Sequence, residues 1–170
     1  PSRIAALLTT GRHIGIDRDP IALEAAAKRL EPYKDRVTLV HSNFSEIAKV
    51  LSQLGISGVD GILLDLGVSS PQLDDASRGF SYMHDAPLDM RMDATAPLTA
   101  YDVVNTWSYE ELRRILFEYG EERYAPAIAK KIVQARETAP VQTTLELAEL
   151  IRSAMPAAAL REKQHPAKRS

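Results

Sequence analysis

Short apolar runs alternate with helix-like stretches along the first 67 residues of the chain. The apolar runs span residues 12–17, 36–44 and 60–67, and the stretches between them cover residues 19–31 and 45–55. Strands and helices that alternate at this spacing form a parallel sheet, because each helix returns the chain to the starting edge of the sheet. The third run is continuously apolar at its centre, as in a strand that is covered on both faces. The sequence therefore predicts an α/β fold of the doubly wound type.

Residues at the ends of these stretches support the two helix predictions. Asp19 has the short polar side chain of an N-cap, and Pro20 follows at the first helical position, where its missing N–H breaks no hydrogen bond. Gly55 is the residue type that most often ends a helix. Local chemistry as well as composition therefore bounds both helices.

Residues 68–100 have neither helical nor strand periodicity. The segment is rich in Ser, Pro, Asp, Met and Gly, and it is longer than the ~12–15 residues beyond which loops in compact domains are uncommon. Its aromatic and methionine side chains argue against disorder. We therefore expect a long, ordered and functional loop.

The chain after residue 100 has the pattern of helices. Ser108 with Glu111, and Thr143 with Glu146, each form the sequence signature of a capping box at a helix start. A further helix is expected at about residues 122–137. We therefore place a domain boundary near residue 100, with an α/β part at residues 1–100, which includes the loop 68–100, and a helical part at residues 101–170.

Composition excludes several classes of protein. The chain of 170 residues has no cysteine, so it forms no disulfide and no thiolate metal site, and its 4 histidines have no ligand-like spacing. We predict no metal site. No stretch reaches the ~18 consecutive apolar residues of a membrane span, and the first residues do not resemble a signal peptide. We therefore expect a cytosolic protein that does not bind a membrane.

Charge is distributed unevenly along the chain. Residues 61–100 contain six acidic and two basic residues, a net charge of −4, whereas residues 123–170 contain nine basic and four acidic residues, a net charge of +5. This asymmetry allows the C-terminal part to face a polyanion. Ordinary solvated helix faces that happen to be basic explain it equally well.

Two acids and an aromatic residue follow the predicted strands. Asp17 ends the first strand, Phe44 follows the second and Asp65 ends the third. In open α/β sheets, ligands bind beyond the carboxyl ends of the strands. A strand-terminal acid can accept both hydroxyls of a ribose, and an aromatic ring can cover an adenine. The three positions together predict a nucleotide-type ligand, although each one alone is as well explained by a turn or by core packing.

The residues alone leave the class of protein open. The glycine-rich loop that would distinguish a dinucleotide from S-adenosylmethionine is absent from the sequence. A nicotinamide-dependent oxidoreductase would use Asp17 equally well. A non-catalytic RNA- or protein-binding fragment would use the helical part.

The segment 65–93, DLGVSSPQLDDASRGFSYMHDAPLDMRMD, resembles the signature of the bacterial 16S ribosomal RNA cytosine-N4 methyltransferases, the RsmH or MraW family. The resemblance extends over nearly the whole chain through further blocks in the family's order: GIDRDP at 15–20, EYGEERYA at 118–125, Ile128 with Ala129, and HPAKR at 165–169. A nicotinamide-dependent enzyme would not explain the segment 65–93.

This resemblance implies a fold, a reaction and a set of ligand-binding residues. The fold is a Rossmann-like methyltransferase sheet with an inserted helical substrate domain. The reaction is S-adenosylmethionine-dependent methylation of the exocyclic N4 of a cytidine in the decoding region of 16S ribosomal RNA, in the small ribosomal subunit. Asp17 is the expected ribose-binding acid, Phe44 the adenine neighbour, and Asp65 and Gln72 the remaining cofactor contacts.

Two further groups of residues are expected to meet the substrate. Ser69 and Ser70 follow the third predicted strand in an irregular, proline-stiffened loop, and we expect one of them to orient the cytosine amine. Five basic residues are candidates for phosphate contact: Arg123, Lys130, Lys131, Lys168 and Arg169. Lys130 and Lys131 are adjacent on a helix and point to different sides, so at most part of this set faces RNA.

The extent of the chain differs from the family's pattern. In the family's sheet, the strand with the glycine-rich loop lies between the strands that end at Asp17 and Asp65, and this strand and the later ones are not in the sequence. A missing central strand leaves backbone groups unpaired. We therefore expect the chain alone to be inactive and not to bind S-adenosylmethionine tightly.

Overall fold

The computed structural model describes residues 2–156 and residue 167. The chain has a mixed α/β fold and forms two compact units. The first, called the α/β unit, comprises Pro1–Leu66 and Met92–Thr95, and the second, called the helical unit, comprises Gly67–Arg91 and Ala96–Ser170. The short stretch 92–95 therefore belongs to a different unit from the residues on either side of it.

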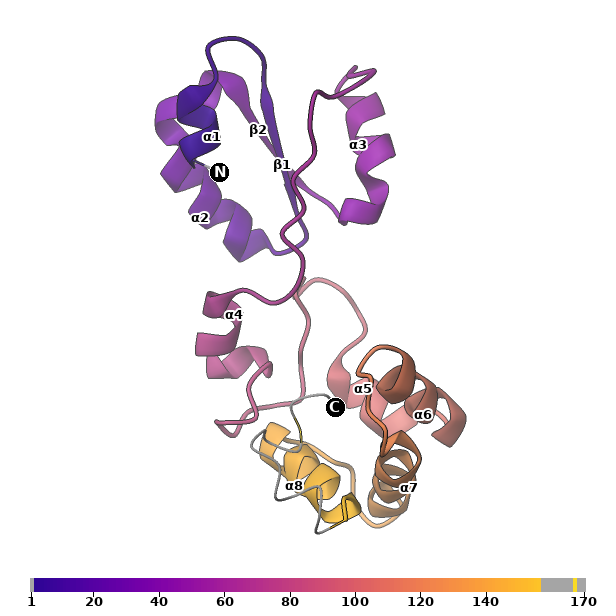
Figure 1. The fold of residues 1–170 in the computed structure, drawn as a ribbon. Helices are drawn as coiled ribbons and strands as arrows, with labels where there is room; N and C mark the ends of the chain where they lie inside the picture. The colour runs from indigo at the N-terminus through magenta and orange to yellow at the C-terminus, as the bar shows by residue number, and fades with distance from the viewer. Residues whose placement is uncertain (1, 157–166, 168–170) are drawn as a thin grey trace. The chain divides into compact units, whose positions relative to one another are not determined.

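A parallel pair of strands forms the centre of the α/β unit. Strands β1 (His13–Asp17) and β2 (Val37–His41) are paired from His13 with Val37 to Asp17 with His41. In Figure 1, α1 and α2 lie on one side of the two strands and α3 on the other. This arrangement confirms the parallel α/β prediction. The other elements of this unit are α1 (Ser2–Leu7), α2 (Pro20–Leu30), η1 (Glu31–Arg36), η2 (Phe44–Glu46) and α3 (Ile47–Gln53).

Both predicted helices of this unit are present with the expected ends. The side chain of Asp19 accepts a hydrogen bond from the backbone N–H of Ile21 at 3.0 Å, and Pro20 is the first residue of α2. Gly55 follows α3 with a φ of +68°, in the left-handed region that glycine adopts without strain. The N-terminal helix α1 was not predicted.

The third predicted strand does not form. Residues 61–66 have no regular secondary structure, and Figure 1 draws the chain after α3 as an extended trace with no arrow. Within the described residues, the sheet consists of β1 and β2 alone. A strand exists only through hydrogen bonds to a neighbour, and an apolar sequence does not replace that neighbour. The predicted burial is also wrong, because four side chains are at least 57% exposed: Ile62, Leu63, Leu64 and Leu66.

The helical unit contains the predicted helices of the C-terminal part. Its elements are α4 (Ser70–Asp74), η3 (Ala76–Arg78), α5 (Ala100–Thr106), α6 (Tyr109–Glu118), α7 (Ala125–Arg136) and α8 (Thr144–Ala154). Capping boxes are present where predicted, at Ser108 with Glu111 and at Thr143 with Glu146. Helix α7 contacts α5, α6 and α8 and contributes several fully buried side chains, among them Ile128 and Ala129.

The segment 86–90 of the long loop is an integral part of the helical unit. The backbone N–H of Leu88 donates to the carbonyl of Gln142 at 3.2 Å, and the Leu88 carbonyl accepts from Tyr101 at 2.7 Å. Gly79 lies so close to this segment that a Cβ there would be 2.6 Å from the carbonyl oxygen of Pro87. The loop is ordered, as predicted, and its order comes from hydrogen bonds to helix starts far along the chain.

No helix among the described residues combines the length and the apolar character that crossing a bilayer requires.

Candidate functional site

Asp17 lies at the carboxyl end of β1 with part of its carboxylate unused. Its Oδ1 accepts a hydrogen bond from the backbone N–H of Asp19 at 2.9 Å, which orients the side chain. Its Oδ2 accepts no hydrogen bond from any residue that the structure describes, and the side chain is exposed. A fixed, exposed carboxylate with a free oxygen is suited to accept hydroxyl groups of a ligand.

Phe44 follows β2 after two residues and opens η2. Asn43 caps this short helix, because its Oδ1 accepts a hydrogen bond from the backbone N–H of Ser45 at 3.1 Å. The cap places the Phe44 ring at the surface, where the residue is 54% exposed. The alternative that Phe44 is a core residue is therefore wrong in this structure. An exposed ring beside the strand ends can cover the flat face of a heterocycle.

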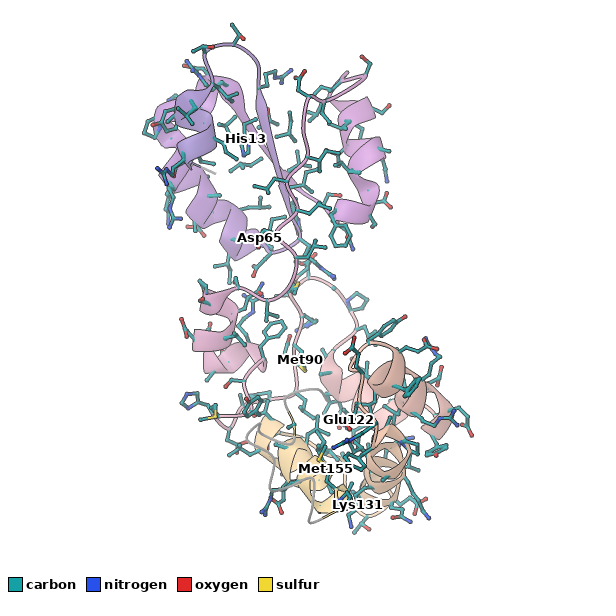
Figure 2. The ribbon with its side chains drawn as sticks, in the orientation of Figure 1. His13, Asp65, Met90, Glu122, Lys131 and Met155 are labelled. Atoms are coloured by element: carbon teal, nitrogen blue, oxygen red, sulfur yellow. The ribbon has the colours of Figure 1, made fainter. Side chains whose placement is uncertain are left out.

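Asp65 is not held by the sheet. It lies in the extended segment that follows α3, where it is labelled in Figure 2, and it is exposed. The structure thus places Asp17 and Phe44 at the ends of paired strands, whereas Asp65 lies in the same unit but outside the sheet.

A histidine and a further aspartate lie at the same strand ends, and sequence reasoning did not identify either as a site residue. His41 is the last residue of β2 and the partner of Asp17 in the parallel register. Its Nε2 lies 3.2 Å from Oδ2 of Asp93, in the stretch 92–95, and 3.0 Å from the carbonyl oxygen of Arg18. The pKa of Asp93 is lowered, first by the hydroxyl and backbone N–H of Thr95 and also by His41. The only signal in the sequence was that the second apolar run contains a histidine near its end.

Ser69, Ser70 and Gln72 belong to the helical unit, where they form the start of α4. The backbone N–H of Ser69 donates to Oε1 of Gln72 at 3.0 Å, and Gln72 is buried. The prediction of an irregular loop here is wrong, because a serine at the N-cap and a proline in the first turn favour a helix start. Gln72 therefore has a structural role in this unit, whereas Ser69 and Ser70 are exposed.

The basic candidates lie on α7 and just before it. The guanidinium of Arg123 lies over the ring of Tyr124, 5.0 Å from its centre. Lys130 and Lys131 are exposed on α7, and Lys131 is labelled in Figure 2. Lys168 and Arg169 lie outside the described residues.

Arg91, in the long loop 68–100, has a structural role. Arg91 donates to both carboxylate oxygens of Asp89, with the shortest contact at 2.6 Å, and its third nitrogen donates to the carbonyl of Ala96 at 2.8 Å. The hydrogen bonds and charge of Arg91 lower the pKa of Asp89, with a small contribution from Arg78. Arg91 therefore pairs with a neighbouring acid.

Comparison with known proteins identifies a family. The MraW methylase family matches residues 2–170 of the chain. The chain is 58% identical over 170 residues to ribosomal RNA small subunit methyltransferase H of Brevibacillus brevis, which covers 99% of this chain and 54% of that protein. It is also 58% identical to the proteins of the same name from Paenibacillus sp. and Thermobifida fusca, covering 98% and 94% of this chain and 55% and 48% of those proteins. The chain thus spans about half the length of the curated relatives it matches.

Proposed function

The chain belongs to the MraW methylase family, and on this basis we propose that it binds S-adenosylmethionine for methyl transfer to ribosomal RNA of the small subunit. The proposed binding site is the strand-end edge, which we define as the carboxyl ends of β1 and β2 at Asp17 and His41 together with Phe44. The relatives are named as ribosomal RNA small subunit methyltransferases. The observation that carries the proposal is the placement of Asp17 and Phe44 at the ends of two paired parallel strands. A nicotinamide-dependent oxidoreductase is disfavoured by the family. A ribosomal substrate implies a cytoplasmic site of action.

Asp17 and Phe44 fit the cofactor by their chemistry. The free Oδ2 of Asp17 would accept a ribose hydroxyl, and the exposed ring of Phe44 would cover the adenine. Asp65 and Gln72 are the remaining proposed cofactor contacts, and the amide oxygen of Gln72 also accepts the hydrogen bond from Ser69 that supports the start of α4. The cofactor supplies an electrophilic methyl group on a sulfonium centre. The proposed fold is a Rossmann-like sheet in residues 1–100, with the helices of residues 101–170 as the inserted substrate-recognition domain.

The proposed methyl acceptor is the exocyclic N4 of a cytidine in the decoding region of 16S ribosomal RNA. A cytosine amine is a poor nucleophile because its lone pair is delocalised into the ring. Hydrogen-bond acceptors on its N–H bonds hold the nitrogen pyramidal and in line for attack, and proximity supplies much of the remaining acceleration. The exposed hydroxyl of either Ser69 or Ser70 is the proposed acceptor. The proton leaves easily once the nitrogen is methylated, so no strong base is required.

The RNA is proposed to contact the basic residues of the helical part. Arg123, Lys130 and Lys131 are exposed there, and Lys168 and Arg169 are the remaining candidates. Phosphate contacts by such residues give affinity without sequence specificity. The target cytosine is recognised separately, after it has unstacked from its neighbours in the RNA.

Methyl transfer from radiolabelled cofactor tests this function. A full-length protein, of the relatives' length and containing this sequence, is incubated with small-subunit particles and S-adenosylmethionine labelled in its methyl group. The RNA is then digested and the labelled nucleoside identified. Label in N4-methylcytidine supports the proposal, label in another nucleoside contradicts the substrate, and no label contradicts the enzyme. A Ser70→Ala variant with unchanged turnover and cofactor binding would remove Ser70 from the mechanism.

A further inference from the structure

His41 bridges two parts of the chain at the strand ends. Its Nε2 lies within 3.0 Å of the Arg18 carbonyl oxygen and within 3.2 Å of Oδ2 of Asp93. Both partners are hydrogen-bond acceptors only, so Nε2 carries the hydrogen and donates to both. The imidazole therefore joins the residue next to Asp17 to the stretch 92–95.

Asp93 acts as a link in this bridge. Its Oδ1 accepts hydrogen bonds from the backbone N–H of Thr95 at 2.9 Å and from the Thr95 hydroxyl at 2.6 Å, while Oδ2 faces His41. Both oxygens are therefore used inside the protein, and the carboxylate is less available to a ligand than that of Asp17. Hydrogen bonds from Thr95 and the charge of His41 lower the pKa of Asp93, so the link is a carboxylate at neutral pH.

The bridge lies where a ligand of this unit would bind. Asp17 and His41 are paired in register at the carboxyl ends of β1 and β2. The His41 imidazole therefore connects Asp93 to the carbonyl of Arg18, the residue that follows Asp17. The side chains remain accessible, since 43% of His41 and 20% of Asp93 is exposed.

We propose that His41 is a positioning residue of the cofactor site, which acts through Asp93 to hold the stretch 92–95 as a fixed wall beside Asp17. This inference rests on the proposed function, because the wall matters only if the strand-end edge binds the cofactor. The donor at Nε2 is the property that matters. A glutamine at position 41 retains an N–H donor, whereas a leucine of similar size does not.

Calorimetric titration of the full-length protein with S-adenosylhomocysteine tests the proposal. His41→Leu and Asp93→Asn are expected to weaken binding about tenfold, and His41→Gln is expected to stay within about threefold of the wild type. His13→Gln, at the opposite end of β1, is the matched control and is expected to bind like the wild type. The unfolding temperature of each variant shows whether weaker binding comes from loss of the fold or from loss of the fixed position of the stretch 92–95.

The outcomes distinguish the two proposals. Weak binding by His41→Leu at an unchanged unfolding temperature, together with rescue by His41→Gln, supports the positioning role. Wild-type affinity in His41→Leu overturns it and leaves the proposed function intact. If the wild type itself does not bind, the proposed function is wrong and the positioning role falls with it. Should His41→Leu unfold, Asp93→Asn decides, because it leaves both strands unchanged.

Discussion

Asp17 lies directly opposite His41 in the parallel pairing of β1 and β2, and each is the last residue of its strand. Paired residues of neighbouring strands project from the same face of a sheet. A carboxylate with a free oxygen and an imidazole that holds Asp93 thus share one edge.

The exposed apolar segment 62–66 is expected to make the chain self-associate. It combines exposed leucines with unpaired backbone groups, as edge strands that aggregate do. Burial of a leucine contributes roughly 1.5–3 kcal/mol, so Leu63→Lys should weaken association by about tenfold or more in sedimentation velocity. The control is Leu7→Lys, because Leu7 is 81% exposed against 79% for Leu63 but lies in a helix. An equal effect of both changes would contradict the prediction.

The chain of 170 residues is expected to bind the cofactor only weakly. Asp65, one of the proposed contacts, lies outside any strand and is exposed, so a ligand would have to order the segment 61–66 on binding. Ordering backbone costs roughly 1–2 kcal/mol per residue. Calorimetry with S-adenosylhomocysteine should therefore give no binding in the micromolar range, and micromolar affinity would refute this explanation.

The ion pair of Asp89 and Arg91 is expected to make the free energy of unfolding depend on pH in the acidic range. The hydrogen bond from Arg91 lowers the pKa of Asp89 below its ordinary value of 3.8. The stabilisation is therefore complete above the unfolded-state pKa and is lost as the pH falls through the lowered one. Asp89→Asn should cost about 1–3 kcal/mol at pH 7 and should reduce the loss of stability below about pH 4.

Urea unfolding followed by circular dichroism at pH 7 and at pH 3 measures this effect. Glu118→Gln is the control, because Glu118 forms an exposed ion pair with Arg114 at 3.2 Å and such pairs contribute about 0–1 kcal/mol. A cost for Asp89→Asn no greater than that of Glu118→Gln would show that the pair contributes little.

Part of this structure could be predicted from the sequence because its causes are local. The cap at Asp19 and the capping box at Ser108 depend on residues within one helical turn, and both are present. Helix α5 begins with a capping box of the same kind, Thr99 with Asp102, which could have been read from the sequence and was not.

The remaining features depend on residues that are distant in the sequence. The apolar run 60–67 has strand composition, but a strand also needs a partner, and the described sheet supplies none. Asp93 lies against the end of β2 through its contact with His41, and no periodicity in the sequence indicates that contact. The strand ends could therefore be predicted, whereas what lies against them could not.

RNA binding is expected to depend on only part of α7. Each phosphate contact to a single strand contributes about 0.7 to the slope of log affinity against log salt. Lys130 and Lys131 point to different sides of the helix, so one of Lys130→Ala and Lys131→Ala should lower this slope in filter binding by the full-length protein. Lys28→Ala, on α2 and paired with Glu24 at 2.7 Å, is the control. If neither α7 variant changes the slope, neither lysine contacts RNA.

Binding of S-adenosylmethionine at the strand-end edge of the α/β unit is proposed to depend on Asp17. Calorimetric titration of the full-length protein with S-adenosylhomocysteine measures this dependence, for the wild type and for Asp17→Asn. A hydrogen bond to a charged group contributes about 1.5–3 kcal/mol, so Asp17→Asn should lose affinity by about tenfold to a hundredfold. Asp35→Asn, in η1 before β2, should bind like the wild type. Equal affinity of Asp17→Asn and the wild type would show that Asp17 does not hold the cofactor.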